Sequence, residues 1–383
     1  MGTTESTEAV GRRRRLPRLA VALAALVTLV GAGTAIAAVT ISWPTSQQEI
    51  ASTGIQSSIP FCGTKPITLG IEDGFGINTW SQESYAAVRS EAAKCKNVKQ
   101  IVLAGGGQLN QMISDINSLV AQGANAIAVI PDYGQAELAA IQKATQAGVK
   151  VVPWGADPGG TPGKDYVTYV DWNDPVAGTM WANWMVQALH GKGNVIFLGG
   201  PAGSPVGEAQ LANINAVFAK HPGMKLLTGT KDYAVTNWDP ATAQKVTAAL
   251  LAKYPTINGI IANFGTDALA AIRAFQAAGR PLVPVAALDA NGLSCLYQST
   301  RKSAPQFQIS TISNRNWLGR IAARKAIAAA EGLPNNEPSR ITLPFYENTL
   351  ASSKVFCNPK VGQDFYVSDG ISPAQVKQYG KVG

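Results

Sequence analysis

From residue 67 onward, short apolar runs of strand length alternate with longer segments of helical periodicity, and this alternation restricts the fold most strongly. Met112, Ile116 and Leu119 recur at helical spacing before Gly123, and a β-branched run follows. Such alternation is typical of parallel sheets covered by helices on both faces. The first round predicts strands at 67–71, 100–103, 126–130, 150–153 and 166–170, with helices at 82–94, 108–122 and 136–147.

The pattern then starts again. The second round predicts strands within NVIFLGG, KLLTGTKDY, GIIANFG and LVPVAALD, with helices at 207–220, 240–253 and 268–278. A chain of 383 residues is too long for one compact core. Two successive rounds therefore predict two doubly wound α/β lobes, each with its own parallel sheet.

Composition supports a folded protein and argues against nucleic-acid binding. Hydrophobic residues make up 46% of the chain and charged residues 15%, which is unlike a disordered segment. Of the net charge of +8, residues 1–38 contribute +3 through five arginines and two glutamates. The remaining charge is small and dispersed, and it forms no basic stripe for a nucleic-acid partner.

The first 41 residues have the composition of an export signal or a membrane anchor. The basic stretch GRRRRLPR precedes the uncharged apolar run LAVALAALVTLVGAGTAIAAV. Ala35-Ile36-Ala37 offers the small residues of a cleavage site, whereas residues 19–41 are also long enough to span a bilayer. Both interpretations predict an exported remainder, in the periplasm or at the cell surface, and residues 42–65 have the composition of a polar linker.

The chain has four cysteines, and an even number in an exported protein favours disulfides over a metal site. Three pairings are possible. Cys62 precedes the first predicted strand, and Cys95 ends the helix that returns antiparallel to it, so the two should lie near each other. We therefore predict the pairs Cys62–Cys95 and Cys295–Cys357.

Polar and aromatic side chains gather where the predicted strands end. Glu72 and Asp73 end the first strand, Asn78 and Trp80 follow in the next loop, and Asp157 lies beyond the fourth strand. Ligands of doubly wound folds bind beyond the carboxyl ends of the strands. Planar aromatic rings suit the apolar faces of a sugar, and amide or carboxylate oxygens suit its hydroxyl edges, so these loops predict a small-molecule cleft.

Four segments carry a resemblance to a known family: QMISDINSLVAQGANAIAVIPDYGQAELAAIQKATQAGVKVV, GPAGSPVGEAQLANINAVFAKHPGMKLL, NGIIANFGTDALAAIRAFQAAG and VPVAALDANG. From Ile67 to about Leu343 the chain resembles type I periplasmic binding proteins of the ribose and simple-sugar group. The resemblance implies two lobes joined by a hinge of three crossing strands, near Val170, Ser313 and Ser339. It places one lobe at 66–171 plus 314–338, the other at 172–313 plus 339–357, and a C-terminal tail at 358–383.

The resemblance also implies ligand-binding positions. Trp80 and Trp238 correspond to aromatics that cover the two sugar faces, and Asp289 to an acid that accepts sugar hydroxyls. Asn78 lies beside Trp80, and Asn263 or Phe264 takes the place of a ligand-binding asparagine, with an ambiguity of one residue. Ser313 or Asn314 stands where a hinge glutamine is common. Asp73 is a further candidate because of its position at the end of the first strand.

Three positions depart from the family pattern. Glu208 stands where an arginine is common, WGADP replaces an Asp-Arg pair and leaves Asp157 only approximately placed, and AGGG replaces an asparagine. These departures argue against a ribose pocket. They suit another sugar, a polyol or a ligand with some positive charge.

The sequence gives little support to an enzyme. It has two histidines, neither of which neighbours a nucleophile motif, and it lacks GxxxxGK[ST], HExxH and a nucleophile elbow. We expect no catalytic residue, cofactor or metal. The predicted function is an extracytoplasmic receptor that binds a sugar or polyol as a monomer and delivers it to the permease of an ATP-binding cassette importer. A membrane-held sensory receptor and a receptor for an amine or other non-sugar solute are the alternatives.

Overall fold

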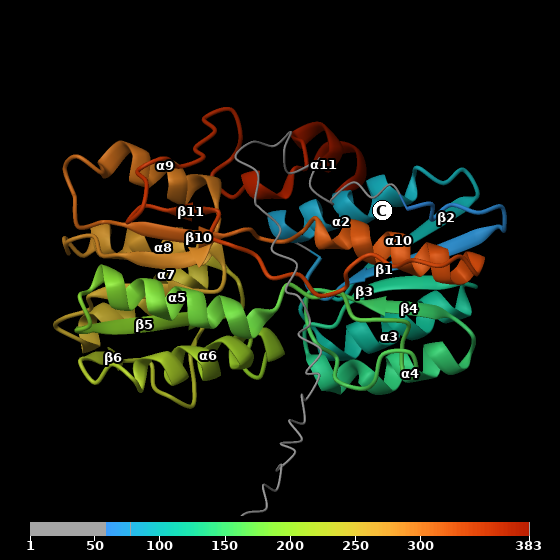
Figure 1. Cartoon of the computed structure of the whole chain (residues 1–383), viewed down its shortest axis with the longest axis horizontal. Coiled ribbons are helices and arrows are strands. Elements are labelled where there is room, and N and C mark those ends of the chain that lie inside the picture. The colour runs from blue at the N-terminus through green and yellow to red at the C-terminus, as the bar shows by residue number, and fades with distance from the viewer. Residues whose placement is uncertain (1–58, 77, 383) are drawn as a thin grey trace, which may run out of the picture. The chain divides into compact units, whose positions relative to one another are not determined.

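A computed structural model describes residues 59–76 and 78–382 of the chain, and within them it shows two separate sheets surrounded by helices (Figure 1). The predicted signal or anchor, and the predicted linker up to residue 58, lie outside the described residues. Among the described residues, no helix combines the length and apolar character needed to cross a membrane. The two sheets confirm the predicted α/β architecture with two rounds of strands and helices.

The first sheet has four parallel strands in the order β2-β1-β3-β4. Alternate residues of its strands face opposite sides: Ala126 and Ala128 join one apolar cluster, and Ile127 and Val129 join another. Helices therefore cover both faces, as the apolar runs predict. In chain order the elements are β1 (Ile67–Asp73), α2 (Thr79–Ala92), β2 (Val98–Ala104), α3 (Leu109–Ala121), β3 (Ala126–Ile130), the 3-10 helix η1 (Gly134–Glu137), α4 (Leu138–Gln146) and β4 (Lys150–Pro153).

The second sheet has the order β11-β10-β9-β8-β5-β6, with β7 also paired to β5, and β11 is its one antiparallel strand. Its helices are α5 (Asp174–Ala188), α6 (Pro205–Phe218), α7 (Pro240–Lys253), α8 (Gly265–Ala277) and α9 (Asn291–Thr300). Its strands are β5 (Gly193–Gly199), β6 (Met224–Leu226), β7 (Ala234–Val235), β8 (Gly259–Ala262), β9 (Val285–Leu288), β10 (Ile309–Ile312) and β11 (Glu347–Asn348).

Before its C-terminal segment, the chain passes between the sheets three times, after β4, after β10 and before β11. After β10 it forms α10 (Leu318–Glu331), which packs on α2 and on strands of the first sheet (Figure 1). The first and third crossings pair with each other: Asp171 N donates to Ser339 O at 2.7 Å, and Ile341 N donates to Asp171 O at 2.9 Å. An ion pair between Arg340 and Asp171 at 3.0 Å ties the same two segments together.

One predicted strand is wrong. Residues 166–170 form isolated bridges, Pro162 with Tyr166 and Trp154 with Val170, and no regular strand. Val167 N and Val170 N still donate to carbonyls of β4, but the chain is already leaving the first sheet for the second here. Helices α5, α9 and α10 were not predicted from the sequence.

Both predicted disulfides are confirmed. Cys62 pairs with Cys95, and Cys295 pairs with Cys357. The first bond anchors the end of the predicted linker, where Phe61 is buried and Lys65 N donates to Glu331 Oε2 at 3.0 Å. The second bond fixes α9 to the start of residues 358–382, a C-terminal segment that we call the strap.

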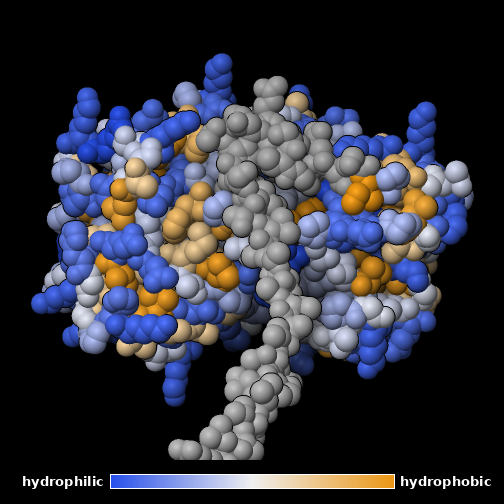
Figure 2. All heavy atoms as spheres, in the orientation of Figure 1, coloured by the Kyte–Doolittle hydropathy of each residue, from blue (hydrophilic) through white to orange (hydrophobic). Residues whose placement is uncertain are grey.

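The strap contains the 3-10 helix η2 (Val367–Asp369) and the helix α11 (Pro373–Tyr379), which packs on α2 of the first sheet. Phe365, Tyr366 and Ile371 are buried. The predicted tail is thus part of the folded core. The face shown in Figure 2 is mainly hydrophilic where it is not covered by grey atoms, with hydrophobic residues in small separate groups.

Candidate functional site

A cavity lies at the carboxyl ends of strands from both sheets. Six predicted ligand-binding residues line it: Asp73, Asn78, Trp80, Trp238, Asn263 and Phe264. Phe75, Asp132 and Arg315 complete the lining and were not predicted. The cavity therefore joins residues that follow β1, β3, β7, β8 and β10.

Local chain geometry places these side chains. Asp73 is the last residue of β1, and its Oδ1 accepts hydrogen bonds from Phe75 N and Gly76 N, which folds the following loop back onto the strand end. Asn78 caps α2 by accepting from Ser81 N at 2.8 Å. Its predicted ligand-binding role and its cap role therefore fall on the same side chain.

Trp238 and Arg315 have backbones in the left-handed region, with φ of 50° and 65°. Residues with bulky side chains rarely adopt such angles, and each costs of order 1–3 kcal/mol. Strained residues of this type cluster at functional sites. Two of them on one cavity support its assignment as the candidate site independently of its shape.

Phe75 and Trp238 close the cavity from opposite sheets. Their ring centroids lie 5.1 Å apart with an interplanar angle of 70°, and Trp238 Nε1 donates to Asn263 Oδ1 at 3.1 Å. The remaining volume is about 30 Å³, which has room for water and is too small for a sugar ring. A sugar ring therefore needs Phe75 and Trp238 to move apart.

Trp80 was predicted to cover one face of a sugar, but its ring is held by contacts within the protein. Its ring stacks on Trp154 at 6.1 Å and carries the Arg315 guanidinium at 5.6 Å, and its Nε1 donates to Asn314 O at 3.2 Å. The side chain is buried. Contacts within the protein thus occupy the ring, and the aromatic pair that meets across the cavity is Phe75 with Trp238.

Among the described residues, Arg315 is the one cationic residue in the cavity lining. Its guanidinium lies 4.5 Å from the centroid of Trp172 as well as over Trp80. Its Nε has no hydrogen-bond partner in the part of the chain that the structure describes. The two indole rings hold the guanidinium in place. It can donate to a ligand hydroxyl, and so it supplies the kind of donor that the sequence lacks at Glu208.

Carboxylates gather beside and behind the cavity. Asp73 and Asp132 line it, and both are buried together with Glu72 and Glu137. Burial raises the pKa of Asp73, and burial with neighbouring acids raises the pKa of Glu72 and Asp132 well above the ordinary range. Asp73 Oδ2 and both Glu72 oxygens have no hydrogen-bond partner in the described part of the chain. No group of three or more His, Cys, Asp or Glu among the described residues is arranged to hold a metal ion.

Four predicted ligand-binding residues do not line the cavity. Asp157 is exposed and accepts from Gly159 N in a local turn, and Glu208 is exposed in the first turn of α6. Asp289 and Asn314 are buried and bonded to each other: Asn314 N donates to Asp289 Oδ1 at 2.8 Å. Asn314 lies next to Arg315, which does line the cavity, and its predicted hinge position stays a prediction.

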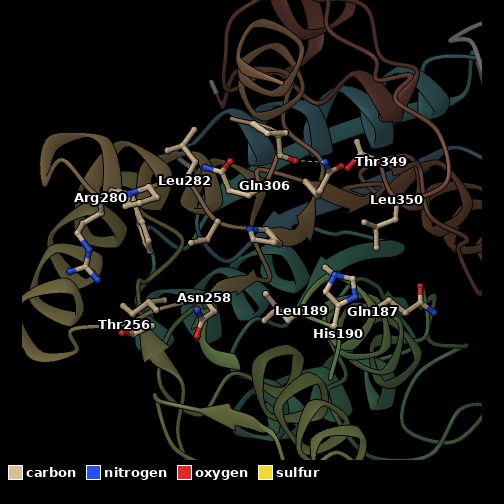
Figure 3. A pocket seen from close by; sticks show the side chains of 18 residues that line it. Gln187, Leu189, His190, Thr256, Asn258, Arg280, Leu282, Gln306, Thr349 and Leu350 are labelled. Atoms are coloured by element: carbon tan, nitrogen blue, oxygen red, sulfur yellow. Dashed lines mark hydrogen bonds between the residues drawn. The ribbon is translucent and has the colours of Figure 1, made fainter. Parts of the chain in front are cut away.

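A larger hollow of about 750 Å³ opens at the amino ends of β8, β9 and β10 (Figure 3). His190, Asn258, Gln306 and Thr349 are among the side chains around it. Ligand sites of doubly wound sheets lie at the carboxyl ends of the strands. The smaller cavity between the two sheets is therefore the better candidate.

Comparison with known proteins identifies the class that this fold and cavity define. Residues 74–334 match the sequence profile of a family described as periplasmic binding protein domain. The match covers more than half of the chain, so the chain belongs to this family.

Two curated relatives are partial matches. The chain is 29% identical to a xylitol-binding protein of Mycolicibacterium smegmatis over 219 residues, which are 56% of this chain and 61% of the relative. It is 26% identical to a D-apiose import binding protein of Paraburkholderia graminis over 197 residues, 51% of this chain and 61% of the relative. The matches thus span less than two thirds of each relative.

Solved structures show the same fold. The periplasmic binding protein of the arabinose ABC transporter from Shewanella sp. ANA-3, bound to arabinofuranose, has a TM-score of 0.63 at 18% identity, covering 75% of this chain and 94% of that one. An ABC transporter solute binding protein from Agrobacterium vitis with bound allitol has a TM-score of 0.63 at 19% identity, covering 74% and 95%. At these identities the likeness shows the fold alone, which is that of type I periplasmic binding proteins.

Proposed function

We propose that this protein is an extracytoplasmic receptor that binds a sugar or polyol between its two lobes and delivers it to the permease of an ATP-binding cassette importer. The proposed lobes are residues 66–171 with 314–338, and residues 172–313 with 339–357. One observation carries the proposal: residues from the carboxyl ends of both sheets meet around a single cavity. In this function no covalent chemistry takes place, and the receptor acts as a monomer.

Binding follows from the lining. Opening the lobes separates Phe75 from Trp238, and a ligand ring or carbon chain then lies between the two aromatic side chains. Its hydroxyls donate to Asp73 and Asp132 and accept from Arg315. The ligand shifts the population toward the closed form by its greater affinity for that form, and the closed form docks on the permease.

The printed ligands of the relatives guide the ligand class. The curated relatives are described as binding xylitol and D-apiose, and the similar structures hold arabinofuranose and allitol. All four are small, uncharged polyhydroxylated molecules. We therefore place linear polyols and pentoses first among the candidate ligands.

A second candidate is a receptor for a cationic solute. Asp73 and Asp132 line the cavity against one cation, Arg315, and Glu72 and Glu137 lie behind them. This excess of carboxylates favours an amine over a sugar acid. The neutral polyol remains the first choice, because an uncharged ligand needs no change in the ionisation of the buried acids.

A thermal-shift screen of the full chain tests both candidates. The panel contains pentoses, hexoses, polyols, amino acids and cationic osmolytes. A ligand that binds only the folded state raises the melting temperature, by an amount that grows with its concentration. A shift with a sugar or polyol supports the proposal, a shift restricted to amines supports the second candidate, and no shift across the panel refutes both.

A further inference from the structure

The strap connects the two sheets a fourth time. At its start, Asn291 N of α9 donates to Phe365 O at 2.9 Å, and Gly292 N donates to Gln363 O at 2.8 Å, which holds it against the second sheet. Tyr366 N then donates to Glu83 Oε1 of α2 at 3.0 Å. Figure 1 shows α11 beside α2, on the side of the first sheet. The strap therefore passes between the lobes directly beside the hinge.

Where it passes the hinge, the strap covers Asp289 at the carboxyl end of β9. Ser368 Oγ donates to Asp289 Oδ1 at 2.7 Å and lies 2.8 Å from Ser313 Oγ, and Ser368 N donates to Asp289 Oδ2 at 3.3 Å. Asn314 N donates to the same Oδ1 at 2.8 Å. Both carboxylate oxygens of Asp289 are therefore occupied by the protein itself.

Asp73, one of the two acids that line the cavity, differs from Asp289 in its hydrogen bonding. It is equally buried, yet its Oδ2 has no hydrogen-bond partner among the described residues. The strap also lies immediately behind the cavity wall, because the ring of Tyr366 packs 6.0 Å from that of Phe264, which lines the cavity. Asp289 is thus an acid at a strand end, next to the site. The hydrogen bonds from the strap keep its carboxylate from contacting a ligand there.

The side chain that occupies the Asp289 carboxylate is that of Ser368. A serine side chain is a hydroxymethyl group, and the same group ends every linear polyol and many sugars. We propose that Ser368 limits the size of the ligand. Its side chain occupies the place beside Asp289 where a longer polyol would put its terminal hydroxymethyl group. This inference rests on the proposed function and concerns the same site.

Titration calorimetry of the full chain with erythritol, xylitol, sorbitol and a heptitol tests the inference. Ser368→Gly removes one hydroxymethyl group and opens its space. The affinity for the polyol one carbon longer than the best wild-type ligand should rise at least tenfold relative to that best ligand. Ser368→Ala removes only the hydroxyl and leaves a methyl group where the terminal carbon of a longer ligand would lie, so it should leave the ratio unchanged. Ser372→Gly, in the same strap at the cap of α11, is the matched control.

Two results would overturn the inference while leaving the proposed function intact: a wild-type protein that binds a polyol but shows the same size preference after Ser368→Gly, or an equal shift in Ser368→Ala. Wild-type protein that binds none of the polyols overturns both. A second measurement does not depend on the folding of variants. Because Ser368 stays on Asp289, the titration midpoint of the Asp289 carboxyl carbon in wild-type NMR spectra should not change when xylitol is added, and a shift of that midpoint refutes the inference.

Discussion

Trp238 and Trp80 line the same cavity, yet replacing them with alanine should have different effects. Trp238 is partly buried, and its ring meets Phe75 across the cavity. Its loss removes one of the two aromatic walls, which should weaken ligand binding by about 1–3 kcal/mol, or roughly 5- to 150-fold in Kd. Trp80 packs against Trp154 and Arg315, and its Nε1 donates to Asn314 O. Its truncation should cost about 3–5 kcal/mol of unfolding free energy, as for other buried aromatics.

The two effects are separated by two measurements on each variant. Urea denaturation gives the free energy of unfolding, and titration calorimetry with the best ligand of the screen gives Kd. Trp238→Ala should lose affinity with a small loss of stability, and Trp80→Ala should lose mainly stability. A Kd within threefold of wild type for Trp238→Ala would refute the assignment of the aromatic walls. A stable Trp80→Ala protein with greatly weakened binding would restore Trp80 as the platform.

Two further predictions concern stability. Burial raises the pKa of Glu137 from 4.5 to about 8, so between these values the folded state binds a proton that the unfolded state releases, and the free energy of unfolding should fall as pH rises. Glu137→Gln should reduce the difference between urea midpoints measured at about pH 5 and about pH 8, and an unchanged difference would contradict this. Replacing Cys62 and Cys95 by serine opens a loop with a sequence separation of 33 and should cost about 4 kcal/mol by the chain-entropy relation. A loss below about 1 kcal/mol in the same urea assay would contradict that estimate.

The fold was predictable because alternation is a local signal. The apolar runs at 126–130 and 150–153 coincide with β3 and β4, and the helix at 240–253 coincides with α7. The segment 166–170 has the same apolar character, yet it belongs to a crossing between sheets. Its residues form isolated bridges with Pro162 and Trp154 and donate two hydrogen bonds to carbonyls of β4. Nothing in its composition marks the place where the chain leaves the sheet.

The site was predictable where one rule applies, namely that ligands bind at the carboxyl ends of strands. This rule places Asp73, Asn78 and Asn263 beside the cavity, and applied to the third strand it would also have found Asp132. Arg315 could not be predicted from the sequence, because its position depends on a left-handed backbone and on two indole rings from distant segments.

Asp289 shows a second limit of predicting the site from the sequence. The rule places it correctly at a strand end, and the resemblance gives it a ligand-binding role. Its partner, however, is Ser368, which is 79 residues away and lies in a segment with no recognisable pattern. A hydrogen bond between residues so far apart in the sequence depends on the three-dimensional path of the strap.

The contacts between the lobes differ in strength, and this difference indicates where the cleft opens. On the hinge side, the backbone bonds and the ion pair of Asp171 join two crossings, and the strap adds buried contacts at Ser368. Across the cavity, the ring pair of Phe75 and Trp238 joins the two sides and contributes only about 0.5–1.5 kcal/mol beyond its area. Opening at this ring pair breaks a weak contact, whereas release at the strap would expose several buried side chains. The lobes should therefore separate at Phe75 and Trp238 and rotate about a hinge that keeps Ser368 on Asp289.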